Sequence, residues 1–101
     1  MTNPKISIII PCYNAEKWIE QCVNSALNQT YENLEVIVVD NESKDNSLQV
    51  LRDKFGQNSK VIIDTAENIY PYSWEEPVCR ALEHVSGEYF TILGADDFIT
   101  D

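Results

Sequence analysis

Four short apolar runs, rich in β-branched residues, recur along the chain and constrain its fold more than any other feature. They are Ile6–Ile10, Leu34–Val39, Lys60–Ile63 and Tyr89–Leu93. Runs of this length without polar alternation are typical of strands buried on both faces of a parallel sheet. The sequence therefore predicts four parallel strands, with a covering segment between each strand and the next.

Helical periodicity fills the intervals between these runs. We expect Asn14 to cap a first helix, whose apolar residues follow the i, i+3, i+4, i+7 spacing of an amphipathic helix. They are Ala15, Trp18, Ile19, Cys22, Val23, Ala26 and Leu27. A second helix carries Leu48, Leu51 and Phe55 and ends before Gly56; a third carries Trp74, Val78, Ala81, Leu82 and Val85 and ends at Gly87. This β-α-β-α-β-α-β order predicts an α/β fold of three layers, α-β-α, around a mainly parallel sheet.

The length and the position of the last strand bear on domain organisation. A chain of 101 residues forms one domain at most. The fourth strand would leave a bare sheet edge, and an acidic turn follows it directly. We therefore expect residues 1–101 to be a single half-domain whose C-terminal part is missing.

The charge balance restricts the partners. Seventeen acidic side chains against seven basic ones give a formal net charge of −10. Binding to nucleic acid requires a surface of Lys and Arg, so a nucleic-acid partner is excluded. A phosphate ligand would require a metal cation or backbone N–H groups to supply the positive field.

The cysteines and the apolar segments indicate the compartment. Cys12, Cys22 and Cys79 are widely spaced and show no C-x-x-C pattern, so we interpret them as buried free thiols of a reducing compartment. The N-terminal segment lacks the features of a signal peptide, and no apolar stretch approaches the length of a membrane span. The sequence predicts a cytoplasmic location.

In a parallel α/β sheet, ligands bind beyond the carboxyl ends of the strands, so the turns that follow the strands are the candidate site. The first turn, Pro11–Ala15, contains no glycine, which excludes a dinucleotide-binding G-x-G-x-x-G and a P-loop. Tyr13 is suited either to stacking on a nucleobase or to packing, and Asn14 has the alternative role of a cap.

Acidic residues end two of the other strands. Asp40 ends the second run and is suited to accept hydrogen bonds from a base or a ribose. Ser43 and Asp45 follow it, and both are good helix caps. Asp96 and Asp97 form an adjacent pair whose repulsion a Mg²⁺ or Mn²⁺ ion would relieve; an exposed acidic turn is the alternative.

Other polar and aromatic residues have simpler interpretations. We expect His84 to be a solvated helix residue and Trp74 to be part of the core. Tyr70 and Tyr72 lie in an irregular stretch and are suited either to line a cleft or to cover the sheet.

The motifs, taken together, resemble a known family. The segment ISIIIPCYNAEKWIEQCVNSALNQTYENLEVIVVDNESKDNS resembles the opening of family-two glycosyltransferases, with P-x-Y-N, S-hydrophobic-x-N-Q-T-Y and V-V-D-[DN]-x-S-x-D at the expected separations. GEYFTILGADD resembles the strand and acidic metal-binding turn of the same family. The resemblance covers nearly the whole chain.

The resemblance implies a GT-A fold and an inverting glycosyltransferase that uses a nucleotide-diphosphate-sugar donor and a divalent cation, Mg²⁺ or Mn²⁺. By position, Pro11, Tyr13 and Asn14 would lie at the nucleotide and Asp40 would contact the base. Asp96 with Asp97 would bind ribose and the metal. The acceptor would be a saccharide or a lipid-linked molecule, and many members of the family build surface polysaccharides, which implies association with the inner membrane face.

The sequence departs from the family pattern in three places. Gly94 replaces the first Asp of the usual D-x-D-D turn, and Val78–Cys79 stand where Arg–Asn is common. The general base of the family would lie beyond residue 101. A non-catalytic nucleotide-sugar-binding or interaction module of the same fold is therefore the alternative hypothesis, and a receiver-like or flavodoxin-like domain is disfavoured because further strand–helix units are absent.

Overall fold

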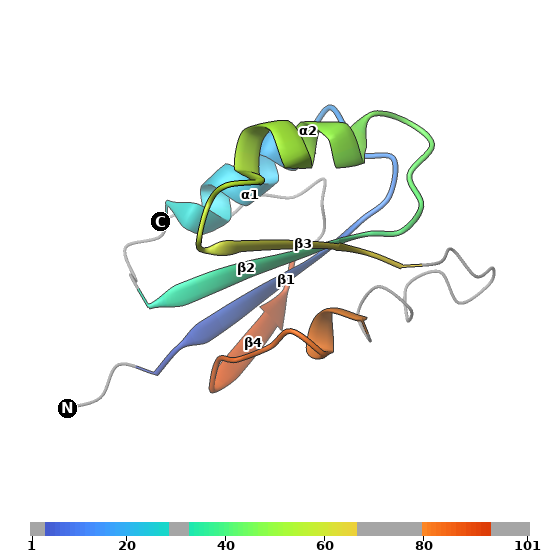
Figure 1. Cartoon of the computed structure of the whole chain (residues 1–101). Coiled ribbons are helices and arrows are strands. Elements are labelled where there is room, and N and C mark those ends of the chain that lie inside the picture. The colour runs from blue at the N-terminus through green and yellow to red at the C-terminus, as the bar shows by residue number, and fades with distance from the viewer. Residues whose placement is uncertain (1–3, 29–32, 67–79, 94–101) are drawn as a thin grey trace.

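The computed structural model describes residues 4–28, 33–66 and 80–93. Its strands form one parallel sheet with the spatial order β3-β2-β1-β4, as Figure 1 shows. The strands are β1 (Ile6–Cys12), β2 (Leu34–Asp40), β3 (Val61–Thr65) and β4 (Tyr89–Ile92), and the helices are α1 (Ile19–Leu27) and α2 (Ser47–Phe55). The predicted parallel α/β sheet is confirmed.

Apolar side chains cover both faces of the sheet. On one face, α1 and α2 lie side by side (Figure 1) and bury the residues of β1 and β2 that point toward them, including Ile10 and Val38, against Leu51 of α2 and its neighbours. On the other face, Ala81 and Val85 pack against a smaller cluster around Ile37. This alternation explains why the strands read as continuous apolar runs, since successive side chains enter opposite cores.

The order of the strands reverses direction at β1. From β1 the chain passes through α1 to β2 and through α2 to β3, always moving to the same side. It then returns to place β4 on the other side of β1, with the segment 80–85 on the opposite face. A reversal of this kind opens a crevice at the carboxyl edge, where ligands bind in α/β sheets.

The first helix begins later than the sequence predicts. Asn14 does not cap it: α1 begins at Ile19, and Trp18 is its N-cap residue without a capping side chain. Trp18 is 47% exposed and therefore does not belong to the buried stripe. The buried stripe of α1 consists of Ile19, Cys22, Val23 and Ala26, at the i, i+3, i+4, i+7 positions.

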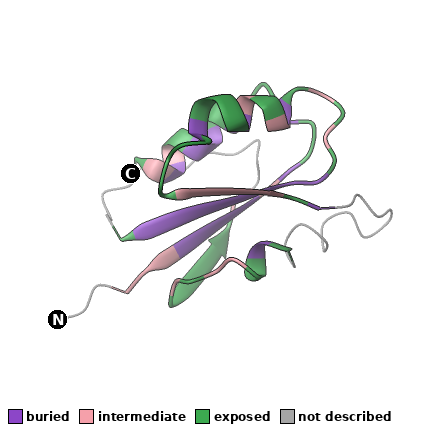
Figure 2. Ribbon diagram, viewed as in Figure 1, coloured by how far each residue is buried: buried purple, intermediate pink, exposed green. Residues whose placement is uncertain are grey.

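The last strand is exposed rather than buried. Tyr89, Phe90 and Ile92 of β4 are between 42% and 63% exposed, in contrast to the buried central strands (Figure 2). Of the third predicted helix, residues 80–82 are helical. Trp74, Val78 and Cys79 lie outside the described residues, as do Tyr70 and Tyr72.

The prediction that His84 is a solvated residue is wrong. Its Nε2 lies 2.7 Å from Oδ2 of Asp64 on β3, and its side chain is 35% exposed. The hydrogen bond with His84 holds the pKa of Asp64 below its ordinary value. The pair fastens the segment 80–85 to β3 on the side of the sheet opposite α1 and α2.

A buried carboxylate joins three parts of the chain at the amino edge of the sheet. Glu35 accepts hydrogen bonds from the Ser7 hydroxyl at 2.6 Å and from the amide and hydroxyl of Ser86 at 2.8 and 3.0 Å. The Lys5 ammonium lies 3.5 Å away. Burial by itself raises the pKa of Glu35, but the hydrogen bonds from Ser7 and Ser86 outweigh it and leave the pKa lowered.

We expect Glu35→Gln to lower the free energy of unfolding by about 1–3 kcal/mol, because three donors lose a charged acceptor. A lowered folded-state pKa contributes stability above the ordinary glutamate pKa of about 4.3, and this stability is lost as the pH falls toward the folded-state value. Urea unfolding from pH 7 to pH 3 should therefore show the difference between the two proteins shrinking below about pH 4. The exposed Glu88→Gln is the control, and an equal effect of both changes would contradict the assignment.

Candidate functional site

The pairing of β1, β2 and β3 brings three strand ends level with one another. Cys12 of β1 is the partner of Asp40, and Asp40 is the partner of Thr65. The Cys12 carbonyl accepts a hydrogen bond from Asn41 N–H at 2.7 Å, and the Asp40 carbonyl accepts one from Ala66 N–H at 2.9 Å. The loops after β1 and β2 therefore leave the sheet side by side.

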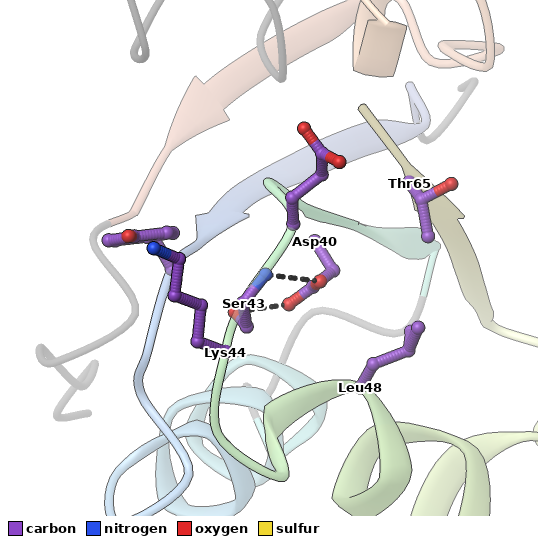
Figure 3. Close-up of a pocket in the computed structure, with 7 residues that line it drawn as sticks. Asp40, Ser43, Lys44, Leu48 and Thr65 are labelled. Atoms are coloured by element: carbon purple, nitrogen blue, oxygen red, sulfur yellow. Dashed lines mark hydrogen bonds between the residues drawn. The ribbon is translucent and has the colours of Figure 1, made fainter. Parts of the chain in front are cut away.

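Asp40 is almost entirely buried, with 2% of its surface exposed. Ser43 binds both oxygens of the Asp40 carboxylate: its amide donates to Oδ2 at 3.0 Å and its hydroxyl donates to Oδ1 at 2.5 Å (Figure 3). This explains how a carboxylate is tolerated at the end of a buried strand, since burial without such donors is costly.

Asn14 connects the two loops instead of capping a helix. Its amide donates to the Ser43 hydroxyl at 2.9 Å, and its side-chain Oδ1 accepts from Lys44 N–H at 2.7 Å. Its φ of 49° places it in the left-handed region, which Asn tolerates better than most residues. That conformation prevents Asn14 from holding the extended backbone that a cap residue requires.

The N–H groups that precede α1 are bound by side chains of the other loop. Ser47 Oγ accepts from Ala15 N–H at 2.8 Å, and Asp45 Oδ2 accepts from Glu16 N–H at 3.2 Å. Asp45 Oδ1 also accepts from Ser47 N–H at 2.9 Å. Burial raises the pKa of Asp45, but hydrogen bonds from the Ser47 hydroxyl and from the Ser47 and Glu16 amides outweigh it, so that the pKa is lowered.

These contacts correct two predictions about caps. Ser43 does not cap α2, because its hydroxyl is used by Asp40. Asp45 does bind the start of α2, but it lies one residue before Asn46, the N-cap residue, whose own side chain makes no capping bond. Asp45 thus accepts hydrogen bonds from backbone N–H groups at the start of α2 and shortly before α1.

A pocket of about 680 Å³ opens above these strand ends. Of the described residues, Tyr13, Asp40, Glu42, Ser43, Lys44, Leu48 and Thr65 line it, as Figure 3 shows. Tyr13 is 44% exposed, so its ring is not a core residue. The lining combines an aromatic ring and an apolar side chain with two carboxylates and one ammonium group, a mixture suited to a polar organic ligand.

The predicted site residues fall into three groups. Tyr13 and Asp40 line the same pocket. Asn14 does not line it, but its amide donates a hydrogen bond to Ser43, which does. Pro11 lies in β1 itself, half-buried and outside the pocket lining. Asp96 and Asp97, with Gly94, lie outside the described residues, and among residues 4–28, 33–66 and 80–93 no group of three or more His, Cys, Asp or Glu is arranged to hold a metal.

Pro11 did not end β1 as its ring suggests. The amide of Ile6 donates across to Asn33, so the alternate residues of β1 donate toward β2 and Pro11 faces the β4 side. Among the described residues, the pairing of β1 with β4 ends at Ile9 and Ile92, before it reaches Pro11. A proline is therefore accommodated in a central strand at the point where its outer neighbour stops.

The predicted candidate turn Asp40–Asp45 contains Glu42 and Lys44, although neither was named individually, whereas Leu48 and Thr65 were missed. Glu42 and Lys44 stand at the variable positions of V-V-D-[DN]-x-S-x-D, which is why the motif did not mark them. Glu42 also has a φ of 52°, an uncommon conformation that turns the loop above Asp40. Leu48 was recognised only as part of a helix stripe.

Comparison with solved structures identifies the class of fold. S. aureus TarS 1–349 matches with a TM-score of 0.80 and 31% identity, over 93% of this chain and 28% of that chain. The mannosyltransferase PcManGT from Pyrobaculum calidifontis, in complex with GDP-Man and Mn²⁺, matches with a TM-score of 0.79 and 28% identity, over 94% of this chain and 28% of that one. The predicted GT-A fold is confirmed.

Comparison of sequences identifies the family. A model described as "Glycosyl transferase family 2" matches residues 7–101. A glycosyltransferase of uncharacterised function from Haemophilus influenzae is 37% identical over 102 residues, which span the whole of this chain and 40% of that protein. The chain belongs to glycosyltransferase family 2, and it spans less than half the length of these relatives.

Two further properties bear on the setting of the site. Neither helix in the described part of the chain has the length and apolar character needed to cross a membrane. Cys12 and Cys22 are buried thiols outside any disulfide, as predicted. Cys12 lies against the strand end beneath the pocket, where burial, together with the nearby Asp40 carboxylate, raises the pKa of its thiol to about 12.

We expect Cys12 to resist a thiol-specific reagent at pH 8, because only the thiolate reacts and a thiol with a pKa of about 12 is almost fully protonated. Mass spectrometry of peptides after alkylation should find Cys12 unmodified in the folded protein and fully modified in urea. Rapid labelling of Cys12 under native conditions would contradict the burial of this strand end.

Proposed function

We propose that this chain binds the nucleotide-diphosphate-sugar donor in a glycosyl transfer from the donor to an acceptor hydroxyl. The observation that carries the proposal is the convergence of Tyr13 and Asp40 on one pocket at the carboxyl edge of a family-two glycosyltransferase fold. In this proposal Tyr13 stacks on the base, Asp40 accepts a hydrogen bond from it, and Pro11 and Asn14 shape the wall behind the nucleotide.

The solved neighbours support a nucleotide sugar as the ligand. PcManGT was solved with GDP-Man and Mn²⁺, and TarS 1–349 was solved with UDP. The pocket of this chain has a volume suited to part of such a molecule and an exposed aromatic ring at its wall. Because this pocket also carries two carboxylates, a diphosphate must extend away from Asp40 and Glu42, toward a source of positive charge.

Asp96 and Asp97 are the residues we propose for ribose and for a divalent cation, Mg²⁺ or Mn²⁺. In the sequence they follow β4, the strand that neighbours β1 on the side opposite β2. Two adjacent carboxylates are hard oxygen ligands of the kind these ions prefer. A bound ion would offset the charge of the leaving diphosphate.

The transfer itself requires more than these residues. We propose inversion at the anomeric carbon, with the acceptor hydroxyl attacking opposite the leaving nucleoside diphosphate. The general base is expected beyond residue 101, and the acceptor is expected to be a saccharide or a lipid-linked molecule, consistent with a place at the cytoplasmic membrane face. The buried thiols of Cys12 and Cys22, which are not in a disulfide, fit a reducing compartment.

We expect Mn²⁺ together with a nucleoside diphosphate to raise the melting temperature of the chain by about 10–20 °C at a ligand concentration of 100 times Kd, since this excess contributes about 2.7 kcal/mol. Asp97→Ala should abolish the rise. Differential scanning fluorimetry with UDP, GDP, ADP and CDP, each with and without Mn²⁺, measures it.

The exposed Asp53→Ala on α2 is the matched control, because it removes a carboxylate far from the strand ends. A rise that survives Asp97→Ala would exclude the metal role of that residue. No rise with any of the four diphosphates would reject donor binding itself. Binding without transfer or hydrolysis in the full-length protein would favour the non-catalytic alternative, to which Gly94 points.

A further inference from the structure

We infer that Lys44 binds the diphosphate of the nucleotide donor, as the one basic side chain that this chain contributes to the pocket above its strand ends. The inference rests on the proposed function and extends it from the base to the charged part of the donor. Three observations carry it: the distribution of basic residues along the chain, the anchoring of the Lys44 backbone between two loops, and the side of the pocket on which Lys44 lies.

The chain has seven Lys and Arg residues, and the structure describes every one of them. They are Lys5, Lys17, Lys44, Arg52, Lys54, Lys60 and Arg80. Of these seven, Lys44 alone lines the pocket. The segments outside the described residues contain neither Lys nor Arg, so they have no second basic side chain to offer. If a Lys or Arg of residues 1–101 contacts a ligand in this pocket, it is therefore Lys44.

The backbone of Lys44 is fixed where the loops after β1 and β2 meet. Its N–H donates to Oδ1 of Asn14 at 2.7 Å, across 30 residues of sequence. The preceding residue, Ser43, accepts a hydrogen bond from the Asn14 N–H at 2.9 Å. The exposed side chain of Lys44 thus extends from an ordered point of the pocket wall.

Lys44 lies on the side of the pocket that leads from Asp40 toward β1. Asp40 is level with Thr65 of β3 on one side and with Cys12 of β1 on the other. Thr65 forms the β3 side of the pocket, whereas Lys44 extends away from Thr65 (Figure 3). In the proposed function the donor runs from a base at Asp40 toward the acidic pair that follows β4, the strand beyond β1. Its diphosphate therefore passes the β1 side, where Lys44 is placed.

The charge of Lys44 is available to a ligand. No carboxylate of the described residues forms an ion pair with it, in contrast to Lys5, whose ammonium lies 3.5 Å from Glu35. A lysine ammonium carries three donors and no acceptor, which suits phosphate oxygens. Asp40 and Glu42 also line the pocket, so the charged side chains of its described wall would only repel a diphosphate if Lys44 were absent.

The experiment compares three ligands that share a base and differ only in phosphate. They are uridine, UMP and UDP, or the corresponding compounds of whichever base gives the largest rise in melting temperature. Isothermal titration calorimetry measures their affinities for the wild-type chain and for Lys44→Met at one concentration of Mn²⁺. Methionine removes the charge and leaves the backbone hydrogen bond to Asn14 in place.

We expect Lys44→Met to weaken diphosphate binding about 10-fold, the low end of the range for hydrogen bonds to charged groups, and to leave the nucleoside affinity unchanged. Lys44→Arg, which keeps the charge, should retain the preference for the diphosphate. The difference between the wild-type chain and Lys44→Met should shrink in about 0.5 M NaCl, because salt screens an exposed charge. Lys54→Met on α2 is the matched control, since it removes the same charge outside the pocket lining.

The outcomes separate this role from donor binding. If Lys44→Met weakens the nucleoside and the diphosphate equally, or weakens neither, Lys44 does not bind the diphosphate and donor binding stands. An equal loss in Lys54→Met would show that only the net charge of the chain matters, and it would also overturn the role of Lys44. If none of the ligands binds the wild-type chain, donor binding is overturned, and the role of Lys44 with it.

Discussion

The parallel pairing of β1 with β2 is the constraint on which the rest of this molecule depends. The two strands are in register along their whole length, from Ile6 opposite Leu34 to Cys12 opposite Asp40. Because they end at the same level, their loops emerge in contact, and short polar side chains are sufficient to join them. A shift of one residue would turn Asp40 toward the opposite face of the sheet and displace Asn14 from Ser43, its partner in the neighbouring loop.

The two edges of the sheet carry carboxylates in different ways. At the amino edge, Glu35 is enclosed by Ser7, Ser86 and Lys5, and its hydrogen bonds join β1, β2 and the segment that leads into β4. At the carboxyl edge, Ser43 donates hydrogen bonds to both oxygens of Asp40, which borders an open pocket. The first arrangement is closed and structural, whereas the second leaves an acceptor facing a cavity.

The parallel sheet, its strand positions and the placing of Tyr13 and Asp40 at one edge could be predicted from the sequence, because apolar runs and helical spacing are local patterns. The caps could not. Asn14 has the residue type of an N-cap, but its neighbours in space are Ser43 and Lys44, some thirty residues along the chain. His84 likewise appeared solvated because its partner, Asp64, is distant in sequence. Such contacts depend on the three-dimensional fold, and the spacing of residues along the sequence does not show them.

The hydrogen bonds between the loops after β1 and β2 also affect how much conformational entropy is lost when a ligand binds. Asn14, Ser43 and Ser47 already hold the backbone on both sides of the pocket through hydrogen bonds between the loops. A side chain that must be ordered on binding costs about 0.5–1.5 kcal/mol, and the groups behind this wall are ordered beforehand. A ligand that enters here would therefore lose little affinity to conformational entropy on the β1–β2 side.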